Sequence, residues 1–212
     1  MKLLDFIFLH RNWSKDKLKF GRRLKRLFYD RLPVSLVIFP EGTTICQEAV
    51  VKSDKYADDN GLPKPKYTLV PRITGLQYAL ECIGEHLDGI WDLTIGYDGV
   101  PVGEYPENVF GLFNLFGYKD APAEIHIHLR YYALSHIPYQ NPEAFKKWIF
   151  KIYSEKDTML LNFSMRKRFS GTDLASFNVA PPFLIYSLYL VIPGASLILY
   201  AAARYLYLRS FF

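Results

Sequence analysis

The chain has 212 residues, a length typical of one domain with appended segments, and 50% of them are hydrophobic, which excludes disorder for most of the chain. The only two cysteines, Cys46 and Cys82, argue against a disulfide framework and a cysteine-based metal site. The formal charge of +5 favours anionic partners, among them phospholipids, phosphorylated metabolites and nucleic acids.

The first predicted elements are apolar strands and a basic helix. Residues 5–9 (DFIFL) form an apolar run that predicts a buried strand. Residues 15–31 hold eight Lys or Arg, interleaved with apolar side chains at helical spacing, and predict a basic amphipathic helix. Residues 34–39 predict a second strand. A helix should start after it, because Thr44 and Gln47 fit a capping box.

Further strands and helices are predicted in the middle of the chain. Short strands are expected over residues 68–73 and 91–97, with a helix over 75–83 between them. Residues 124–132 (EIHIHLRYY) alternate polar and apolar side chains, as a half-buried strand does. Residues 142–161 predict a helix that begins with proline. The pattern indicates an α/β fold, a mixed sheet flanked by helices.

The C-terminal part differs in composition. Residues 183–203 contain no charged side chain, and about 20 apolar residues suffice to cross a bilayer. We expect a C-terminal transmembrane segment there, or a re-entrant one because a Pro-Gly step interrupts it; a buried core helix is the alternative. The predicted organisation is a domain over 1–161, a basic juxtamembrane linker over 162–182, this membrane segment, and a tail over 204–212.

The stretch VIFPEGTTI, residues 37–45, has the features of a binding site at the end of a strand. Gly42 would allow a tight turn, and free N–H groups of the following helix would favour an anion such as phosphate. The Glu41 carboxylate would repel an anion, yet it can hold a guanidinium or accept hydrogen bonds from sugar or glycerol hydroxyls. Arg11, at the end of the first predicted strand, would supply that guanidinium if the two strands are neighbours. An ordinary structural turn is the alternative.

Three motifs resemble sequence blocks of the glycerolipid acyltransferase family, which includes the lysophosphatidic acid and lysocardiolipin acyltransferases. FIFLHRNW (6–13) resembles its second block, FPEGT (39–43) its third and LVPRITGL (69–76) its fourth, in the right order. Further pieces, such as TIGYDGVP (94–101) and IHIHLRYYAL (125–134), are similar to the lysocardiolipin and lysophosphatidylinositol branch, especially its fungal members. The resemblance covers most of the chain.

This resemblance implies a site for the phosphate and glycerol of a lysophospholipid. In the family the second-block Arg and the third-block Glu-Gly contact the acceptor, which maps onto Arg11, Glu41 and Gly42. Thr43 would help to form the same pocket, and Pro71 matches the proline of the fourth block. Acyl-CoA would be the co-substrate. Neither a bound cofactor nor a metal would be needed, because the thioester is already activated.

The family's catalytic first block is not found in the sequence. That block is an Asn-His pair followed by four residues and an Asp, and its His takes the proton of the acceptor hydroxyl. None of the five histidines has an Asp five residues later, and only five residues precede FIFLHRNW. The resemblance therefore implies an N-terminally truncated domain, and no catalytic residue is assigned. His10 is a weaker candidate for the base, with a pocket-wall role as its alternative.

The sequence leaves open whether this chain is an enzyme. One hypothesis is an acyl-CoA-dependent lysophospholipid acyltransferase of the endoplasmic reticulum membrane, or of mitochondrial or other endomembranes. The other is a catalytically inactive, membrane-bound remnant that binds phospholipid or acyl-CoA; a peptide-binding or structural membrane protein is a weaker third. No nucleic-acid recognition module is visible. The acceptor headgroup, the acyl-chain preference and the oligomeric state are not fixed.

Overall fold

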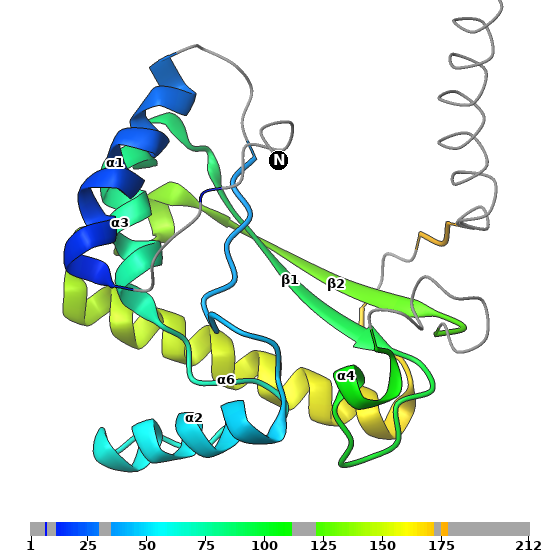
Figure 1. Cartoon of the computed structure of the whole chain (residues 1–212). Coiled ribbons are helices and arrows are strands. Elements are labelled where there is room, and N and C mark those ends of the chain that lie inside the picture. The colour runs from blue at the N-terminus through cyan, green and yellow to red at the C-terminus, as the bar shows by residue number, and fades with distance from the viewer. Residues whose placement is uncertain (1–6, 8–11, 30–34, 112–121, 172–174, 178–212) are drawn as a thin grey trace, which may run out of the picture. The chain divides into compact units, whose positions relative to one another are not determined.

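The computed structural model describes residues 7, 12–29, 35–111, 122–171 and 175–177 (Figure 1). Their helices are α1 (Trp13–Tyr29), α2 (Gln47–Asp59), α3 (Ile73–Ile83), the short α4 (Pro106–Val109) and α6 (Pro142–Arg166). Their strands are β1 (Gly89–Tyr97) and β2 (Ile125–Ala133), with 3-10 turns at Gly84–His86 and Leu134–His136. All these elements belong to one compact unit, Met1–Ser170, and the rest of the chain, Gly171–Phe212, forms a second unit.

β1 and β2 pair as an antiparallel ribbon, with Gly89 opposite Ala133 at one end and Tyr97 opposite Ile125 at the other. Because side chains alternate along a strand, the ribbon has two distinct faces. One face packs on α6 and carries Asp92 of β1 and its partner Arg130 of β2. The opposite face is apolar and exposed to solvent.

The predicted fold class is wrong. A mixed sheet requires strands over 34–39 and 68–73, but in the described residues the sheet has only the two antiparallel strands β1 and β2. Pro71 removes a backbone donor from the second run, Pro40 directly follows the first, and the N–H groups of Leu69 and Val70 bind side chains instead of a strand. The predicted strand over residues 5–9 lies outside the described residues.

The structure does not support a transmembrane segment either. In the part of the chain that the structure describes, no helix is both long and apolar enough to cross a membrane. The longest, α6, has 25 residues but carries charged side chains along its length. The predicted segment over residues 183–203 lies outside the described residues. The predicted domain boundaries stay a prediction.

Several predicted elements are confirmed with different ends. The basic helix is α1, and the strands predicted over 91–97 and 124–132 are β1 and β2. The predicted capping box is wrong, because α2 begins only at Gln47 and its N-cap, Cys46, makes no side-chain capping bond. The helix with Pro142 at its start runs beyond residue 161 and ends at Arg166, and its C-cap, Lys167, adopts a left-handed conformation.

Two apolar clusters share α3. The first joins α3 to α6 and consists of Leu80, Ile137, Phe145, Ile149 and Tyr153. The second joins α3 to α1 and consists of Phe20, Leu24, Ala79 and Ile83. Since α3 contributes to both, through Leu80 on one side and Ala79 and Ile83 on the other, it connects α1 to α6.

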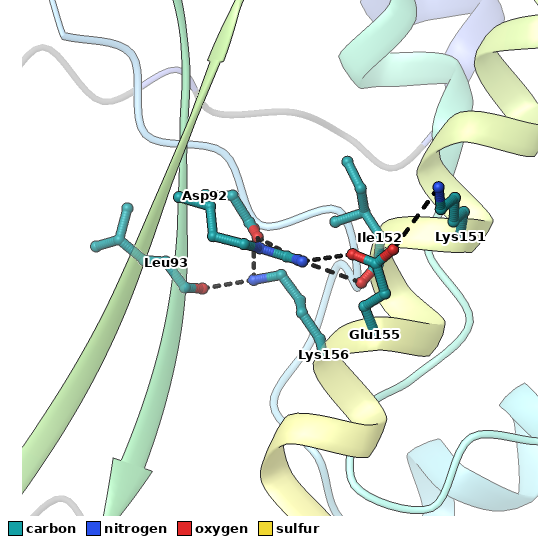
Figure 2. A network of polar contacts seen from close by, with 7 residues as sticks. Asp92, Leu93, Lys151, Ile152, Glu155 and Lys156 are labelled. Carbon is teal, nitrogen blue, oxygen red and sulfur yellow. Dashed lines mark hydrogen bonds and ion pairs between the residues drawn. The ribbon is translucent and has the colours of Figure 1, made fainter. Parts of the chain in front are cut away.

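A network of charged side chains connects the ribbon to α6 (Figure 2). The Asp92 carboxylate accepts hydrogen bonds from Arg130 Nε at 3.1 Å and Nη2 at 2.8 Å, and Lys156 Nζ lies 2.6 Å from its other oxygen. Arg130 Nη1 also pairs with Glu155 at 2.5 Å, and Lys156 Nζ donates to the carbonyl oxygen of Leu93 at 2.5 Å. These charges are compensated across three elements, so the network orients α6 against the ribbon.

Candidate functional site

The segment from Lys66 to Arg72, which leads into the predicted fourth block, is fixed by hydrogen bonds from its backbone to side chains. Asp157 Oδ1 of α6 accepts the backbone N–H groups of Lys66, Tyr67 and Thr68, at 2.9, 2.6 and 3.0 Å. A segment without strand partners needs such acceptors, because an unpaired N–H group that is shielded from water is costly. A single carboxylate thus fixes where this segment enters the site.

Glu41 binds the backbone of Leu69, the residue that follows Thr68. Its Oε2 accepts the backbone N–H of Leu69 at 3.1 Å. The carbonyl oxygen of Pro40 accepts the N–H of Arg72 at 2.7 Å. The FPEGT turn is therefore bonded at two points to the segment from Leu69 to Arg72.

The environment of Glu41 raises the pKa of its carboxyl group. Burial raises the pKa of the Glu41 carboxyl above its usual range, against the lowering effects of the Leu69 N–H and the Lys156 charge; the nearby Asp157 charge also raises it. A raised pKa means that the neutral carboxyl is more populated at a given pH.

Gly42 forms a turn beneath the Arg72 side chain. Its φ of 74° is left-handed, and its N–H donates to the carbonyl oxygen of Phe39 at 3.0 Å. A Cβ at this position would lie 3.5 Å from Arg72 Cδ and 3.6 Å from Nε, which is ordinary contact. The need for glycine here thus comes from the backbone angle.

Replacing Gly42 by alanine is expected to lower the free energy of unfolding by about 1–2 kcal/mol, the cost of a left-handed conformation for a residue with a Cβ. Urea unfolding measures the effect. Gly75→Ala is the matched control, because Gly75 lies inside α3 with nothing near its Cβ position and alanine favours helix there. Equal stability of Gly42→Ala and the wild type would contradict this account of the turn.

A pocket of about 730 Å³ adjoins this turn. Residues of α1, α2, α3 and the first turn of α6 line it, together with the segment from Leu69 to Arg72. Three of the predicted site residues, Glu41, Thr43 and Pro71, are in its wall.

The charges around the pocket suit an anionic ligand that carries hydroxyl groups. Four cations line it: Lys17, Lys52, Arg72 and Lys146. Among the described residues, none of these four makes an ion pair with a carboxylate. Three carboxyl groups line it as well: Glu41, Glu81 and Glu143. Cations without counter-ions in a concave site attract anions, while carboxylates accept hydrogen bonds from hydroxyls.

The structure brings most of the predicted site residues together. Gly42 adjoins the wall that Glu41, Thr43 and Pro71 form. Arg11 lies outside the described residues, so its convergence with Glu41 stays a prediction. The binding roles of all five stay predictions too.

Sequence reasoning missed the pocket cations and Asp157. Arg72 carried a signal, because it follows Pro71 directly within the LVPRITGL motif. Asp157 carried no such signal in the sequence, because it lies 90 positions away from Tyr67, one of the residues whose N–H it binds.

Comparison with known proteins gives the relationship. Residues 115–191 match the family model described as acyltransferase C-terminus. The chain is 28% identical to a 2-acyl-1-lysophosphatidylinositol acyltransferase of Saccharomyces cerevisiae, over 87% of this chain and 55% of that protein. It is 33% identical to lysocardiolipin acyltransferase 1 of Gallus gallus, over 77% of this chain and 41% of that protein. The chain is homologous to the glycerolipid acyltransferases.

These homologues confirm the resemblance that the three motifs predict, including its lysocardiolipin and lysophosphatidylinositol branch. A fungal protein, an uncharacterized acyltransferase of Schizosaccharomyces pombe, is 33% identical to this chain over 76% of this chain and 45% of that protein. The chain spans about half the length of the curated relatives it matches. No solved structure matches it.

Proposed function

We propose that this glycerolipid acyltransferase homologue binds a lysophospholipid as the acyl acceptor, in an acyl-CoA-dependent O-acyltransferase reaction. The pocket carries this proposal, because Glu41, Thr43 and Pro71 of the resembling blocks share it with four cations that make no ion pair within the described residues. The relatives include acyltransferases named for lysophosphatidylinositol, lysocardiolipin and 1-acyl-glycerol-3-phosphate, and these names support the class of acceptor.

The pocket residues would bind and orient the acceptor. Arg72, fixed through its backbone to Pro40, offers a planar guanidinium that suits a phosphate. The Glu41 carboxyl, held by Leu69, would bond to a glycerol hydroxyl. In the reaction the free hydroxyl oxygen attacks the thioester carbonyl carbon, the carbon–sulfur bond breaks, and the CoA thiol leaves. We assign no residue of this chain as the base that takes the hydroxyl proton, so these residues act by positioning.

The proposed setting is the endoplasmic reticulum membrane, with mitochondrial or other endomembranes as the alternatives. The acceptor is an amphiphile, and an enzyme that takes it up benefits from working at a lipid surface. Basic side chains on α1 are exposed and would contact anionic headgroups: Lys15, Lys17, Lys19, Arg22, Lys25 and Arg26. A catalytically inactive lipid-binding protein is the second candidate function, because the pocket residues named above would bind the lipid without a base.

The decisive experiment measures acyl transfer in membranes from cells that express the gene and from cells that lack it. Labelled acyl-CoA is supplied with lysophosphatidylinositol, lysocardiolipin or 1-acyl-glycerol-3-phosphate. We expect expression-dependent transfer to at least one of these acceptors. Equal background rates in both membranes, with retained binding of the lysophospholipid, would replace the enzyme by the lipid-binding candidate.

Arg72→Gln is expected to raise the KM for the acceptor at least tenfold and to leave the KM for acyl-CoA unchanged. The loss of one hydrogen bond to a charged group costs about 1.5–3 kcal/mol, and about 1.4 kcal/mol is a factor of ten. Arg72→Lys should recover part of the lost affinity for the acceptor, because lysine keeps the positive charge but lacks the planar set of donors of a guanidinium. Lys64→Gln is the control, since Lys64 is an exposed cation paired with Asp58 outside the pocket. Equal KM values for Arg72→Gln and Lys64→Gln would exclude Arg72 from the acceptor site.

A further inference from the structure

The pocket extends along one face of α3, beyond the end at which Arg72 lies. Five residues of α3 line it at helical spacing: Ile73, Thr74, Gln77, Tyr78 and Glu81. At about 1.5 Å per residue, Ile73 and Glu81 are about 12 Å apart along the helix axis. A pocket of this length and of about 730 Å³ has room for more than a glycerol and one phosphate, since cavities of about 300–1,000 Å³ hold drug-sized ligands.

Arg72 and Lys52 lie at the first end of the pocket. A Cβ on Gly42 would lie 3.5 Å from Arg72 Cδ and 3.6 Å from Nε, so the Arg72 side chain runs beside the FPEGT turn. Lys52 belongs to this end because its neighbour on α2, Ser53, accepts the N–H of Val70 at 2.9 Å. We call Arg72 and Lys52 the first subsite, where the proposed acceptor would place its phosphate.

Lys17 is fixed farther along α3, beside Tyr78. Its Nζ lies 5.1 Å from the centre of the Tyr78 ring, a cation–π contact, and the Trp13 ring meets the same ring edge-on at 5.3 Å. Tyr78 comes six positions after Arg72, which is about 9 Å along the helix axis. Because α1 and α3 lie side by side (Figure 1), Lys17 extends from one helix over an aromatic ring of the other.

Gly21 allows α1 to approach Tyr78 closely. A Cβ at Gly21 would lie 2.5 Å from Tyr78 Oη, so any other residue there would displace the ring or the helix. Glycine is unfavourable inside a helix, and Gly21 lies within α1. The close approach gives a reason for it, because the Tyr78 ring is the partner of the Lys17 ammonium.

Lys146 approaches the same part of the pocket from α6. Gln77, the neighbour of Tyr78 on α3, donates from Nε2 to the carbonyl oxygen of Tyr139 at 3.2 Å, three positions before α6 begins. Lys146 lies in the first turns of α6 and is half-buried. Within the described residues, neither Lys17 nor Lys146 forms an ion pair with a carboxylate. We call Lys17 and Lys146 the second subsite.

Two exposed carboxylates, Glu81 and Glu143, line the pocket near the second subsite. Glu81 lies one turn after Gln77 on α3, and Glu143 lies one turn before Lys146 on α6. These carboxylates would repel a bare phosphate, but they accept hydrogen bonds from hydroxyl groups. The pocket therefore favours a phosphate that is joined to a hydroxyl-bearing linker over free phosphate.

We propose that the second subsite, Lys17 and Lys146, binds a second phosphate in the headgroup of the acceptor. It would select a lysophospholipid with two phosphates, joined by a hydroxyl-bearing linker such as glycerol, over one with a single phosphate. The inference rests on the proposed function, because the first phosphate occupies the first subsite. The separation of the two subsites along α3 provides the specificity, since one phosphate contacts only one of them.

Binding of soluble headgroups to the full 212-residue chain tests this proposal without catalysis or a membrane. Glycerophosphoglycerol carries one phosphate, and bis(glycerophospho)glycerol carries two phosphates joined by glycerol. Isothermal titration calorimetry at one ionic strength measures both dissociation constants. We expect the two-phosphate headgroup to bind at least tenfold more tightly. Equal dissociation constants would overturn this proposal and leave the pocket as an acceptor site, whereas binding of neither headgroup would overturn the proposed function as well.

Substitutions in the second subsite should remove the preference for two phosphates. Lys17→Gln and Lys146→Gln should each lower the ratio of the two dissociation constants at least fivefold. Lys19→Gln and Lys147→Gln are the matched controls, because both are exposed cations of the same two helices outside the pocket and lose the same charge. If the controls lowered the ratio as much as the subsite variants, general attraction would explain the preference, and the proposal would be wrong.

Coenzyme A is the other source of phosphates in the proposed reaction. We expect coenzyme A not to displace bis(glycerophospho)glycerol from the wild-type chain, and Lys17→Gln to leave its binding unchanged. Displacement by coenzyme A, together with weaker binding of coenzyme A to Lys17→Gln, would assign the second subsite to the acyl donor and overturn the proposal.

Discussion

Replacing Asp92 by alanine is expected to lower the free energy of unfolding by about 3–5 kcal/mol, the cost of breaking a buried ion pair from one side. Asp92 is the shared partner of Arg130 and Lys156, whose side chains are only 19% and 11% exposed (Figure 2). Without the carboxylate, two cations face each other in a site with little water. Urea unfolding of the variant and the wild type measures the difference.

Lys151→Ala is the control for Asp92→Ala. Lys151 belongs to the same network, but its side chain is 78% exposed and its ammonium lies 4.0 Å from Glu155. An exposed pair of this kind contributes about 0.3–0.5 kcal/mol, so this variant should be nearly as stable as the wild type. If the two variants lost the same stability, the network would not connect the ribbon to α6 as described.

Asp157→Ala is the second substitution with a large expected effect. It removes the acceptor for three consecutive backbone N–H groups, and we expect a loss of about 3 kcal/mol, because each unpaired buried donor costs about 1–3 kcal/mol and water reaches the outermost one. The segment that ends at Arg72 would also lose its fixed start, so the KM for the acceptor should rise.

Asp157→Asn separates the two contributions of this side chain. Asparagine keeps the Oδ1 acceptor and removes the charge, so it should retain more than half of the stability that alanine loses. Urea unfolding and the acceptor KM are measured for both variants. Equal losses for asparagine and alanine would show that the charge, and not the three hydrogen bonds, holds the segment.

The alternating pattern predicted β2 but not which of its faces is buried. The residues EIHIHLRYY indicate a strand by their period of two, and β2 forms there. A period of two does not say which face packs on a neighbour, and Ile127 and Leu129 are the exposed ones. The partners that stabilise Arg130 in the interior come from β1 and α6, and local sequence cannot reveal them.

The apolar runs around residues 35–39 and 68–72 have the composition of strands, but composition does not specify a hydrogen-bond partner. The N–H of Leu69 binds a side chain 28 positions away, and the N–H of Tyr67 binds one 90 positions away. Such acceptors replace a strand ladder and depend on the packing of α6. The site motif was more informative, because FPEGT and LVPRITGL placed Glu41, Thr43 and Pro71 at what the structure shows to be one pocket.

The bond between Glu41 and the N–H of Leu69 also limits how this gene can change. The donor is the main chain, which every residue except proline provides alike, so this contact places no demand on the side chain at position 69, which is constrained only by its burial. For the same reason, no new side chain at position 69 can compensate for a lost carboxylate at position 41. A substitution that removes the carboxylate of Glu41 therefore has no second-site suppressor at position 69. A lineage that loses this carboxylate can regain the contact only by reversion or through an acceptor from another position.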